Sequence, residues 1–186
     1  MIRSGAFASA TSAQAAAADC QAALSAAELC ERYAARVHQF ATMVASNDVE
    51  AEDLAQSALE RALRGLSSFD PAKGDVEAWL WRIVVNVARD AGRAVKRRQL
   101  LLERLGRLRG SPEVLGNVPP GVDNEQLLSA VRALTPLQRS VVALRYGADL
   151  EYGAIGNALG ISSGAAAVAA HRALKALRRK LLEDEQ

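Results

Sequence analysis

The chain has 186 residues, half of them hydrophobic and only 4% aromatic, so it has room for one domain or two small ones with cores of small aliphatic side chains. Abundant alanine and few β-branched runs favour packed helices over a sheet. No apolar run reaches the roughly eighteen residues that a membrane span needs. The two cysteines, Cys20 and Cys30, stand ten residues apart without a paired histidine, which argues against a zinc site.

No class of enzyme is indicated by the reactive side chains. The two histidines, His38 and His171, lie far apart in the chain, and no glycine-rich segment has the form of a phosphate-binding loop. We therefore expect no catalytic site, no metal and no cofactor. The net charge of +2 hides five acidic and no basic residues at positions 48–60, and eight basic and two acidic residues at 89–109. Such polarity predicts one surface for a cationic partner and another for an anionic one.

The N-terminal part predicts a flexible leader followed by a helix. Residues 1–24 are rich in alanine, serine and glutamine and carry almost no charge, so no stable apolar face is expected there. From residue 25 to residue 45, apolar residues recur at helical spacing. Ser25, with Glu28 three residues later, has the form of a capping box and predicts the start of this helix.

The second predicted helix, residues 50–66, has two different faces. Its inward face has apolar residues at helical spacing, namely Leu54, Ala58 and Ala62. Its outer face is acidic and amide-bearing, with Asp53, Gln56 and Glu60. Acidic groups near a helix N-terminus can be explained by solvation and by the helix dipole, or they can bind a basic partner.

A loop at residues 67–75 precedes the longest predicted helix, residues 75–98. The loop has turn-forming Asp-Pro and Lys-Gly pairs and one large apolar residue, Phe69. The helix has an apolar stripe and a second, mostly cationic face that repeats every three to four residues: Arg82, Asn86, Arg89, Arg93 and Arg97. This face is either simply solvated or binds a partner that carries phosphates and bases.

The rest of the chain predicts a linker and a second helical domain. Residues 99–123 contain three prolines, so we expect a flexible linker whose first part can continue the preceding helix. In residues 124–186, Thr135-Pro136 with Gln138 predicts a helix start, and a tight turn at Gly160 separates two helices at helix-turn-helix spacing. The last helix is expected to bury Ala166, Ala170, Leu174, Leu177 and Leu181.

Two of these segments resemble the extracytoplasmic-function (ECF) sigma factors of bacterial RNA polymerase, in the sigma-70 family. The segment Phe69-Asp-Pro-x-Lys-Gly, followed by Ala78-Trp79-Leu80-Trp81-Arg82-Ile83-x-x-Asn86, is similar to the part of sigma domain 2 that opens and holds the minus-ten promoter element. The helix-turn-helix is similar to sigma domain 4, which reads the minus-thirty-five element. The resemblance implies an all-α fold with a leader at 1–24, sigma domain 2 at 25–98, a linker at 99–123 and sigma domain 4 at 124–186.

The resemblance also implies partners. The chain is expected to be a cytoplasmic promoter-specificity subunit that binds promoter DNA and the beta-prime coiled coil and beta flap of core RNA polymerase. Members of the family are commonly held by an anti-sigma factor, so such a partner is expected here. The residues implied for core binding are Asp53, Gln56 and Glu60.

The resemblance carries two sets of DNA-contacting residues onto this chain. For the minus-ten element they are Gly65, Phe69, Trp81, Arg82, Asn86, Arg89 and Arg93. Four of these are expected to line a pocket for a base turned out of the duplex: Gly65, Phe69, Trp81 and Asn86. Trp79 is better explained as a core residue. For the minus-thirty-five element the residues are Ser162, Ser163, His171, Arg172 and Lys175.

The predicted recognition helix departs from the family pattern. Its early outer positions, which usually carry lysine or arginine, are Ala165, Ala167, Val168 and Ala169. Such side chains cannot form hydrogen bonds to base edges, so this helix is expected to position the protein more than it reads sequence. Two alternatives stay open. One is a stand-alone helix-turn-helix regulator, which would need neither the acidic helix nor the aromatic pocket; the other is a sigma-like protein with weakened upstream readout.

Overall fold

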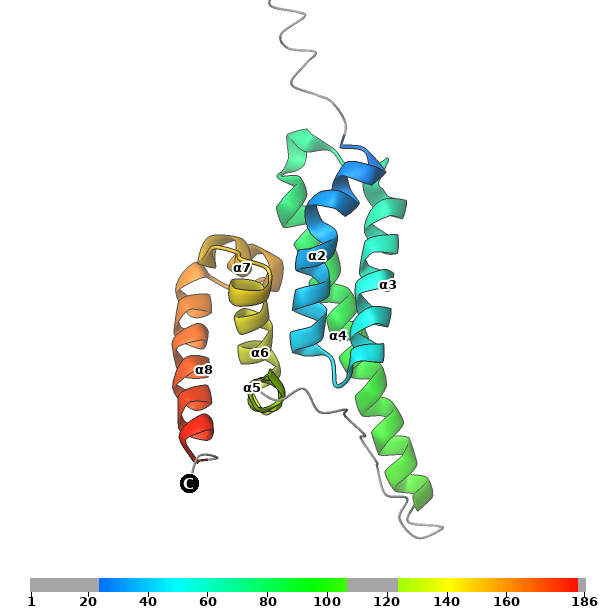
Figure 1. Cartoon of the computed structure of the whole chain (residues 1–186). Coiled ribbons are helices and arrows are strands. Elements are labelled where there is room, and N and C mark those ends of the chain that lie inside the picture. Colours follow the sequence, from blue (N-terminus) through cyan, green and yellow to red (C-terminus); the bar gives the residue numbers. More distant parts are fainter. Residues whose placement is uncertain (1–23, 107–123, 184–186) are drawn as a thin grey trace, which may run out of the picture.

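The computed structural model describes residues 24–106 and 124–183, and these residues form helices joined by short turns (Figure 1). An N-terminal helical unit consists of three long helices: α2 (Ala26–Val44), α3 (Asp48–Leu66) and α4 (Val76–Gly106). A C-terminal helical unit consists of four helices: α5 (Asn124–Arg132), α6 (Pro136–Val142), α7 (Tyr152–Leu159) and α8 (Ser163–Glu183). Two short elements complete the described chain: the 3₁₀ turn η1 (Pro71–Lys73) and the π-helix η2 (Ala143–Gly147). The expected all-helical, two-part fold is confirmed.

Local capping chemistry sets where several helices begin. Ser25 Oγ accepts from the Glu28 N–H at 3.2 Å while the Glu28 carboxylate accepts from the Ser25 N–H at 2.7 Å, so the predicted capping box is present. Hydrogen bonds that the Ser25 side chain and backbone donate to the Glu28 carboxylate lower the pKa of this carboxyl. Thr135 and Gln138 form a second capping box at the start of α6, as predicted. Asn47 caps α3 by accepting from the Glu50 N–H at 2.8 Å.

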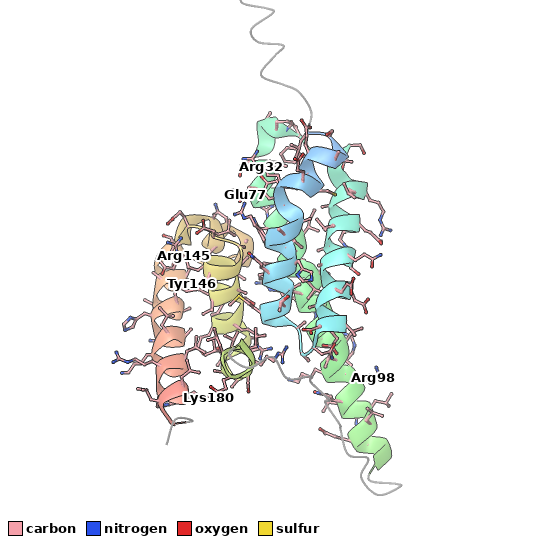
Figure 2. The ribbon with its side chains drawn as sticks, in the orientation of Figure 1. Arg32, Glu77, Arg98, Arg145, Tyr146 and Lys180 are labelled. Carbon is pink, nitrogen blue, oxygen red and sulfur yellow. The ribbon has the colours of Figure 1, made fainter. Side chains whose placement is uncertain are left out.

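The helix α4 continues through the first eight residues of the predicted linker to Gly106, in agreement with the expectation that the first part of the linker extends the preceding helix. This last part runs past the ends of α2 and α3, and Arg98 lies on it (Figures 1 and 2). Three exposed leucines follow, Leu100, Leu101 and Leu102. The rest of the predicted linker, 107–123, and nearly all of the predicted leader, including Cys20, lie outside the described residues.

The main core joins the two units. Aliphatic and aromatic side chains from α2, α3 and α4 form one continuous cluster with residues of η2, α7 and α8. A smaller cluster joins α5, α6 and α8 through Ala130, Val131, Leu134, Val142, Ala173 and Leu177. Ala166, Ala170 and Leu177 are buried as predicted, but Leu174 is 42% exposed and Ala173 takes its place in the core. Position 173 lies three residues after 170 and four before 177, so on a helix it shares the buried face of 166, 170 and 177. Leu174 was predicted instead because leucine is more apolar than alanine.

Among the described residues, no group of histidine, cysteine or acidic side chains is arranged to hold a metal ion. Within the same ranges, no single helix is both long and apolar enough to cross a membrane, although α7 and α8 meet the test together as a pair bent by 101°.

Candidate nucleic-acid interface

The acidic face of α3 is exposed, as the sequence predicts. Asp53, Gln56 and Glu60 all lie on the surface of the N-terminal unit. Gln56 Nε2 donates to Glu60 Oε1 at 3.2 Å, and Arg64 Nη2 pairs with Glu60 Oε2 at 2.9 Å. These pairs are one helical turn apart and fully on the surface, so they contribute little to stability. The face therefore exposes carboxylate and amide groups to solvent, with Asp53 adding a further negative charge.

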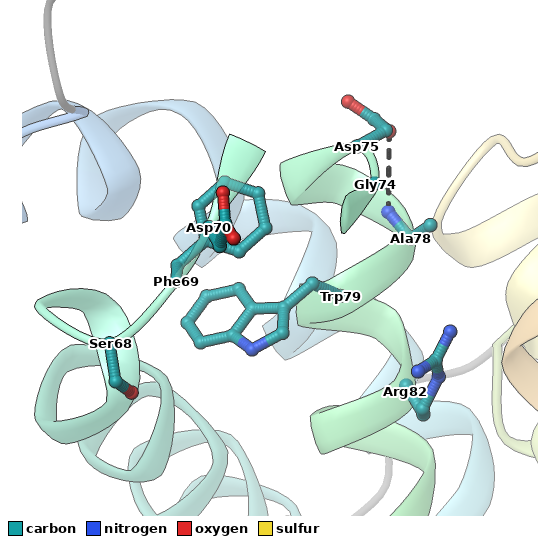
Figure 3. A pocket seen from close by; sticks show the side chains of 8 residues that line it. All are labelled: Ser68, Phe69, Asp70, Gly74, Asp75, Ala78, Trp79 and Arg82. Atoms are coloured by element: carbon teal, nitrogen blue, oxygen red, sulfur yellow. Dashed lines mark hydrogen bonds between the residues drawn. The ribbon is translucent and has the colours of Figure 1, made fainter. Parts of the chain in front are cut away.

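An open pocket lies where the loop after α3 meets the start of α4. It is lined by Ser68, Phe69, Asp70, Gly74, Asp75, Ala78, Trp79 and Arg82 (Figure 3). The rings of Phe69 and Trp79 form its aromatic wall, with centroids 5.2 Å apart and planes tilted by 46°. Asp75 Oδ2 accepts from the Ala78 N–H at 3.3 Å and so fixes the first turn of α4 beside the pocket. A pocket with two aromatic rings and a guanidinium group is suited to an unpaired base and its phosphate.

The two tryptophans lie in the reverse of their predicted positions: Trp79 lines the pocket and Trp81 lies in the core. Trp81 is only 1% exposed and packs edge-on against Phe40 at 5.9 Å, so it is a core residue and not a wall of the pocket. Trp79 is half-buried and lines the pocket. The physical reason is helical spacing: residue 81 shares the buried stripe of Val84 and Val85, whereas residue 79 lies on the other side of the helix.

The other two residues predicted to line the pocket also lie elsewhere. Gly65 lies close to the Trp79 ring, because a Cβ atom built on it would be 3.2 Å from Trp79 Cζ2. A larger residue at position 65 would push the ring, so this glycine supports the pocket without lining it. Asn86 is exposed on α4, one turn beyond Arg82, and is not part of the pocket wall. Of the four predicted lining residues, only Phe69 is in the wall.

The polar face of α4 is exposed along its length: Arg82, Asn86, Arg89, Arg93 and Arg97. Arg93 Nη2 pairs with Asp90 Oδ1 at 2.6 Å, and Arg61 Nη1 lies 3.6 Å from Asp90 Oδ2. The hydrogen bond from Arg93 is the main reason that the pKa of the Asp90 carboxyl is lowered, and Arg61 adds to it. Arg89 Nη2 instead donates to the Leu159 carbonyl of the C-terminal unit at 2.9 Å. The face is therefore cationic, but part of its charge has partners within the chain.

The predicted helix-turn-helix is present in the C-terminal unit. The helix α7 (Tyr152–Leu159) ends at Gly160, which has the left-handed φ of +73°, and α8 then leaves at an angle of 101°. Gly156 is required for this turn, because a Cβ atom on it would lie 2.7 Å from the Ile161 carbonyl oxygen. Ser162 Oγ accepts from the Ala165 N–H at 3.1 Å, so Ser162 caps α8.

The outward face of α8 is small and apolar in its first turns. Gly164 and Ala165 are exposed, and Val168 is 50% exposed. Two of the alanines predicted on this face are not fully outward, since Ala167 is half-buried and Ala169 is 8% exposed. The predicted minus-thirty-five residues are all exposed: Ser162, Ser163, His171, Arg172 and Lys175. His171, Arg172 and Lys175 lie in the third turn of α8 or later.

Comparison with known proteins identifies these two units. The model of sigma-70 region 2 matches residues 29–98, and that of sigma-70 region 4 matches residues 124–177. The chain is also 31% identical to RNA polymerase sigma factor CarQ of Myxococcus xanthus, in a match that covers 85% of this chain and 90% of CarQ. The chain belongs to the ECF sigma factors of the sigma-70 family. Members of this family are promoter-specificity subunits of bacterial RNA polymerase.

Other members of the family support the assignment. This sigma factor is 30% identical to the ECF RNA polymerase sigma factor SigE of Mycolicibacterium smegmatis, over 81% of this chain and 59% of SigE, so it spans well under two thirds of that relative. Among solved structures, CnrH in complex with the cytosolic domain of CnrY matches with a TM-score of 0.62 at 24% identity, over 94% of this chain and 96% of that chain. This likeness supports the fold. The region 2 match contains the acidic face, the pocket and the cationic face.

Proposed function

We propose that this sigma factor selects promoters chiefly through the pocket of Phe69, Trp79 and Arg82. The observation that carries the proposal is the aromatic wall at the start of α4, with its rings 5.2 Å apart, beside the exposed cationic face of the same helix. A base turned out of the promoter duplex would stack on the exposed aromatic surface, and Arg82 would hold its phosphate. Gly65 contributes by leaving space for the Trp79 ring.

The rest of the α4 polar face would hold the minus-ten strand. Arg89 and Arg93 are suited to phosphate groups, and Asn86 carries an amide that can pair with the edge of an adenine. Because Asn86 lies outside the pocket, we assign it to a base next to the one that the pocket takes. Trp81, buried beneath this face, holds α4 in place and does not itself stack on DNA.

The acidic face of α3 would bind core polymerase, through the basic side of the beta-prime coiled coil. Its residues are Asp53, Gln56 and Glu60, which are exposed and lie one turn apart on one side of the helix. The beta flap would take the C-terminal unit, as the family resemblance implies. No step in this function is catalytic, and the place of action would be the cytoplasm, where polymerase and promoters are.

The C-terminal unit would position the protein at the minus-thirty-five element with little sequence selection. Backbone N–H groups at Ser162 and Ser163 and the side chains of Arg172 and Lys175 are suited to phosphates. His171 and Arg172 are the side chains best placed to reach a base edge. The small outward residues of α8 support this proposal. They are also compatible with the alternative of a sigma-like protein whose upstream readout is weak.

An anti-sigma factor is proposed as a further partner. CnrH, whose fold this chain shares, was solved in complex with the cytosolic domain of CnrY. A second solved structure, with a TM-score of 0.60, is that of the sigma factor RpoE with the anti-sigma factor NepR from Bartonella quintana.

The proposed contact of α3 with core polymerase is tested by the binding of a charge-reversed chain to the core enzyme. Asp53→Lys together with Glu60→Lys should weaken assembly by about tenfold or more, and most at low salt, where charge is least screened. The matched control is Glu31→Lys with Glu103→Lys, which reverses two exposed charges outside α3. Affinity is measured by fluorescence anisotropy of the labelled chain with core enzyme. Equal affinity of the two double variants would show that α3 does not make this contact.

A further inference from the structure

The first turn of α4 forms one side of the pocket and is only half-buried. Ala78 and Trp79 line the pocket from this turn (Figure 3). Residues 76–79 are all of intermediate exposure, and the buried residues of α4 begin with Leu80. The other aromatic ring, Phe69, belongs to the loop after α3. The distance between the two rings therefore depends on what holds the first turn of α4 in place.

An ion pair connects this turn to α2. Arg36 Nη1 lies 2.6 Å from Glu77 Oε1, and the two side chains are only 29% and 31% exposed. Glu77 directly precedes the two pocket residues Ala78 and Trp79 in the chain, and it lies beside α2 (Figure 2). Removal of one partner would leave the other charge partly buried and unpaired, which is costly. The pair therefore favours one position of the first turn relative to α2.

Arg36 is itself held from several sides. Its guanidinium lies over the Tyr33 ring at 5.7 Å and over the Trp81 ring at 5.6 Å. Its Nε donates to the Ala148 carbonyl at 2.8 Å, and its Nη2 donates to the same oxygen. A planar guanidinium fixed by these neighbours can hold the Glu77 carboxylate in one place. The sequence analysis singled out neither Arg36 nor Glu77, because only the fold brings the two charges together.

We propose that Arg36 is a positioning residue for the pocket, and that it acts through Glu77 to hold the Trp79 ring where a base can stack. The proposal rests on the proposed function, because it takes the pocket as the site of an unpaired base. Glu77 does not line the pocket and Arg36 lies on another helix, so both would act on the geometry of the ring and not by touching DNA. Binding groups lose effect when the residues that support them let them move by a fraction of their contact distance.

The test separates the contribution of bases from that of phosphates. The full-length chain is titrated against two fluorescently labelled single strands of equal length, one of mixed sequence and one in which every nucleotide is abasic. Anisotropy gives the affinity for each strand, and the ratio of the two affinities measures the contribution of the bases. A change in the overall charge of the chain affects both strands alike, because they carry the same phosphates, and so it cancels in the ratio.

The main variant is Glu77→Ala, which removes the carboxylate and leaves the contact of Arg36 with Ala148 unchanged. We expect it to lower the ratio on the order of fivefold, because the stacking ring is no longer held in place. Glu77→Gln loses the same charge but keeps an oxygen that can accept from Arg36, so it should retain most of the ratio. Glu103→Ala is the matched control, since it removes an exposed glutamate from the far end of the same helix, and it should match the wild type.

A second comparison shows whether Glu77 acts through the ring of Trp79. In a chain that already carries Trp79→Ala, the further change Glu77→Ala should leave the ratio unchanged, because the ring that it positions is absent. A general loss of structure would instead lower the ratio again.

Three results would overturn the positioning role: a wild-type ratio in Glu77→Ala, an equal loss in Glu77→Gln, or a further loss in the Trp79→Ala chain. If circular dichroism shows that Glu77→Ala does not fold, Glu77→Ser takes its place, because a serine side chain is too short to reach Arg36, and the same results decide. A wild-type chain that binds both strands equally would instead refute the proposed function, since its pocket would then take no base.

Discussion

The two helices that we propose as DNA contacts, α4 and α8, both have exposed basic residues, yet they carry different groups for contact with a base. The polar face of α4 carries guanidinium and amide groups beside an aromatic pocket. The first turns of α8 carry Gly164, Ala165 and Val168, which have no hydrogen-bonding side chain. Positive charge therefore predicts binding to DNA, whereas discrimination between sequences requires groups that reach base edges or stack on bases.

The position of the charges strengthens this contrast. On α4, Arg82 lies in the pocket wall beside the aromatic rings. Under the proposed function, a phosphate contact and a stacking surface would then act on the same nucleotide. On α8, Arg172 and Lys175 lie beyond the small residues of the first two turns. In a helix-turn-helix the early turns of the recognition helix contact base edges, so these later cations are left mainly to phosphates. Promoter choice should therefore depend on α4 far more than on α8.

The largest effect is expected from removing the exposed aromatic ring of the pocket. Trp79→Ala should weaken binding of the unpaired minus-ten strand by about 1–3 kcal/mol, because one stacking surface is lost. Trp79→Phe is the control and should retain most of the binding, since a smaller ring still stacks. Permanganate footprinting of promoter opening is the measurement. Normal promoter opening by a folded Trp79→Ala chain would show that the pocket does not bind an unpaired base.

A smaller effect on DNA binding is expected from a substitution on α8. Lys175→Ala should weaken upstream binding almost equally for all minus-thirty-five sequences and reduce the slope of log affinity against log salt by about one. The measurement is the affinity of the holoenzyme for several upstream sequences across a salt series. A loss of affinity confined to one sequence would instead show that Lys175 contacts a base edge. The helix α8 would then discriminate between sequences, as is proposed for α4.

Local chemistry was readable from the sequence, and long-range packing was not. The capping boxes at Ser25 and Thr135 and the turn at Gly160 depend on residues a few positions apart, and all are present. Trp79 and Trp81 were interchanged because both are large and apolar, and only the packing of Trp81 against Phe40 decides which one is buried.

The packing of the C-terminal unit against the N-terminal unit was also not predictable from the sequence. Arg36 and Ala148 lie 112 residues apart in the chain, and nothing in the local pattern of either one pairs them. Gly156, which the helix pattern alone makes a poor choice, proves necessary because the Ile161 carbonyl approaches it in the folded turn. Such requirements come from contacts between elements, and a periodic pattern of polar and apolar residues does not encode them.

The measurement that tests the central contrast most directly is run-off transcription by one reconstituted holoenzyme from two promoter libraries. One library randomises the minus-ten element at a fixed minus-thirty-five sequence, and the other does the reverse. We predict a sharp minus-ten motif and selection at no more than one or two upstream positions. A minus-thirty-five motif of four or more positions, each costing over about 1 kcal/mol when changed, would contradict it and show that α8 reads sequence as α4 does.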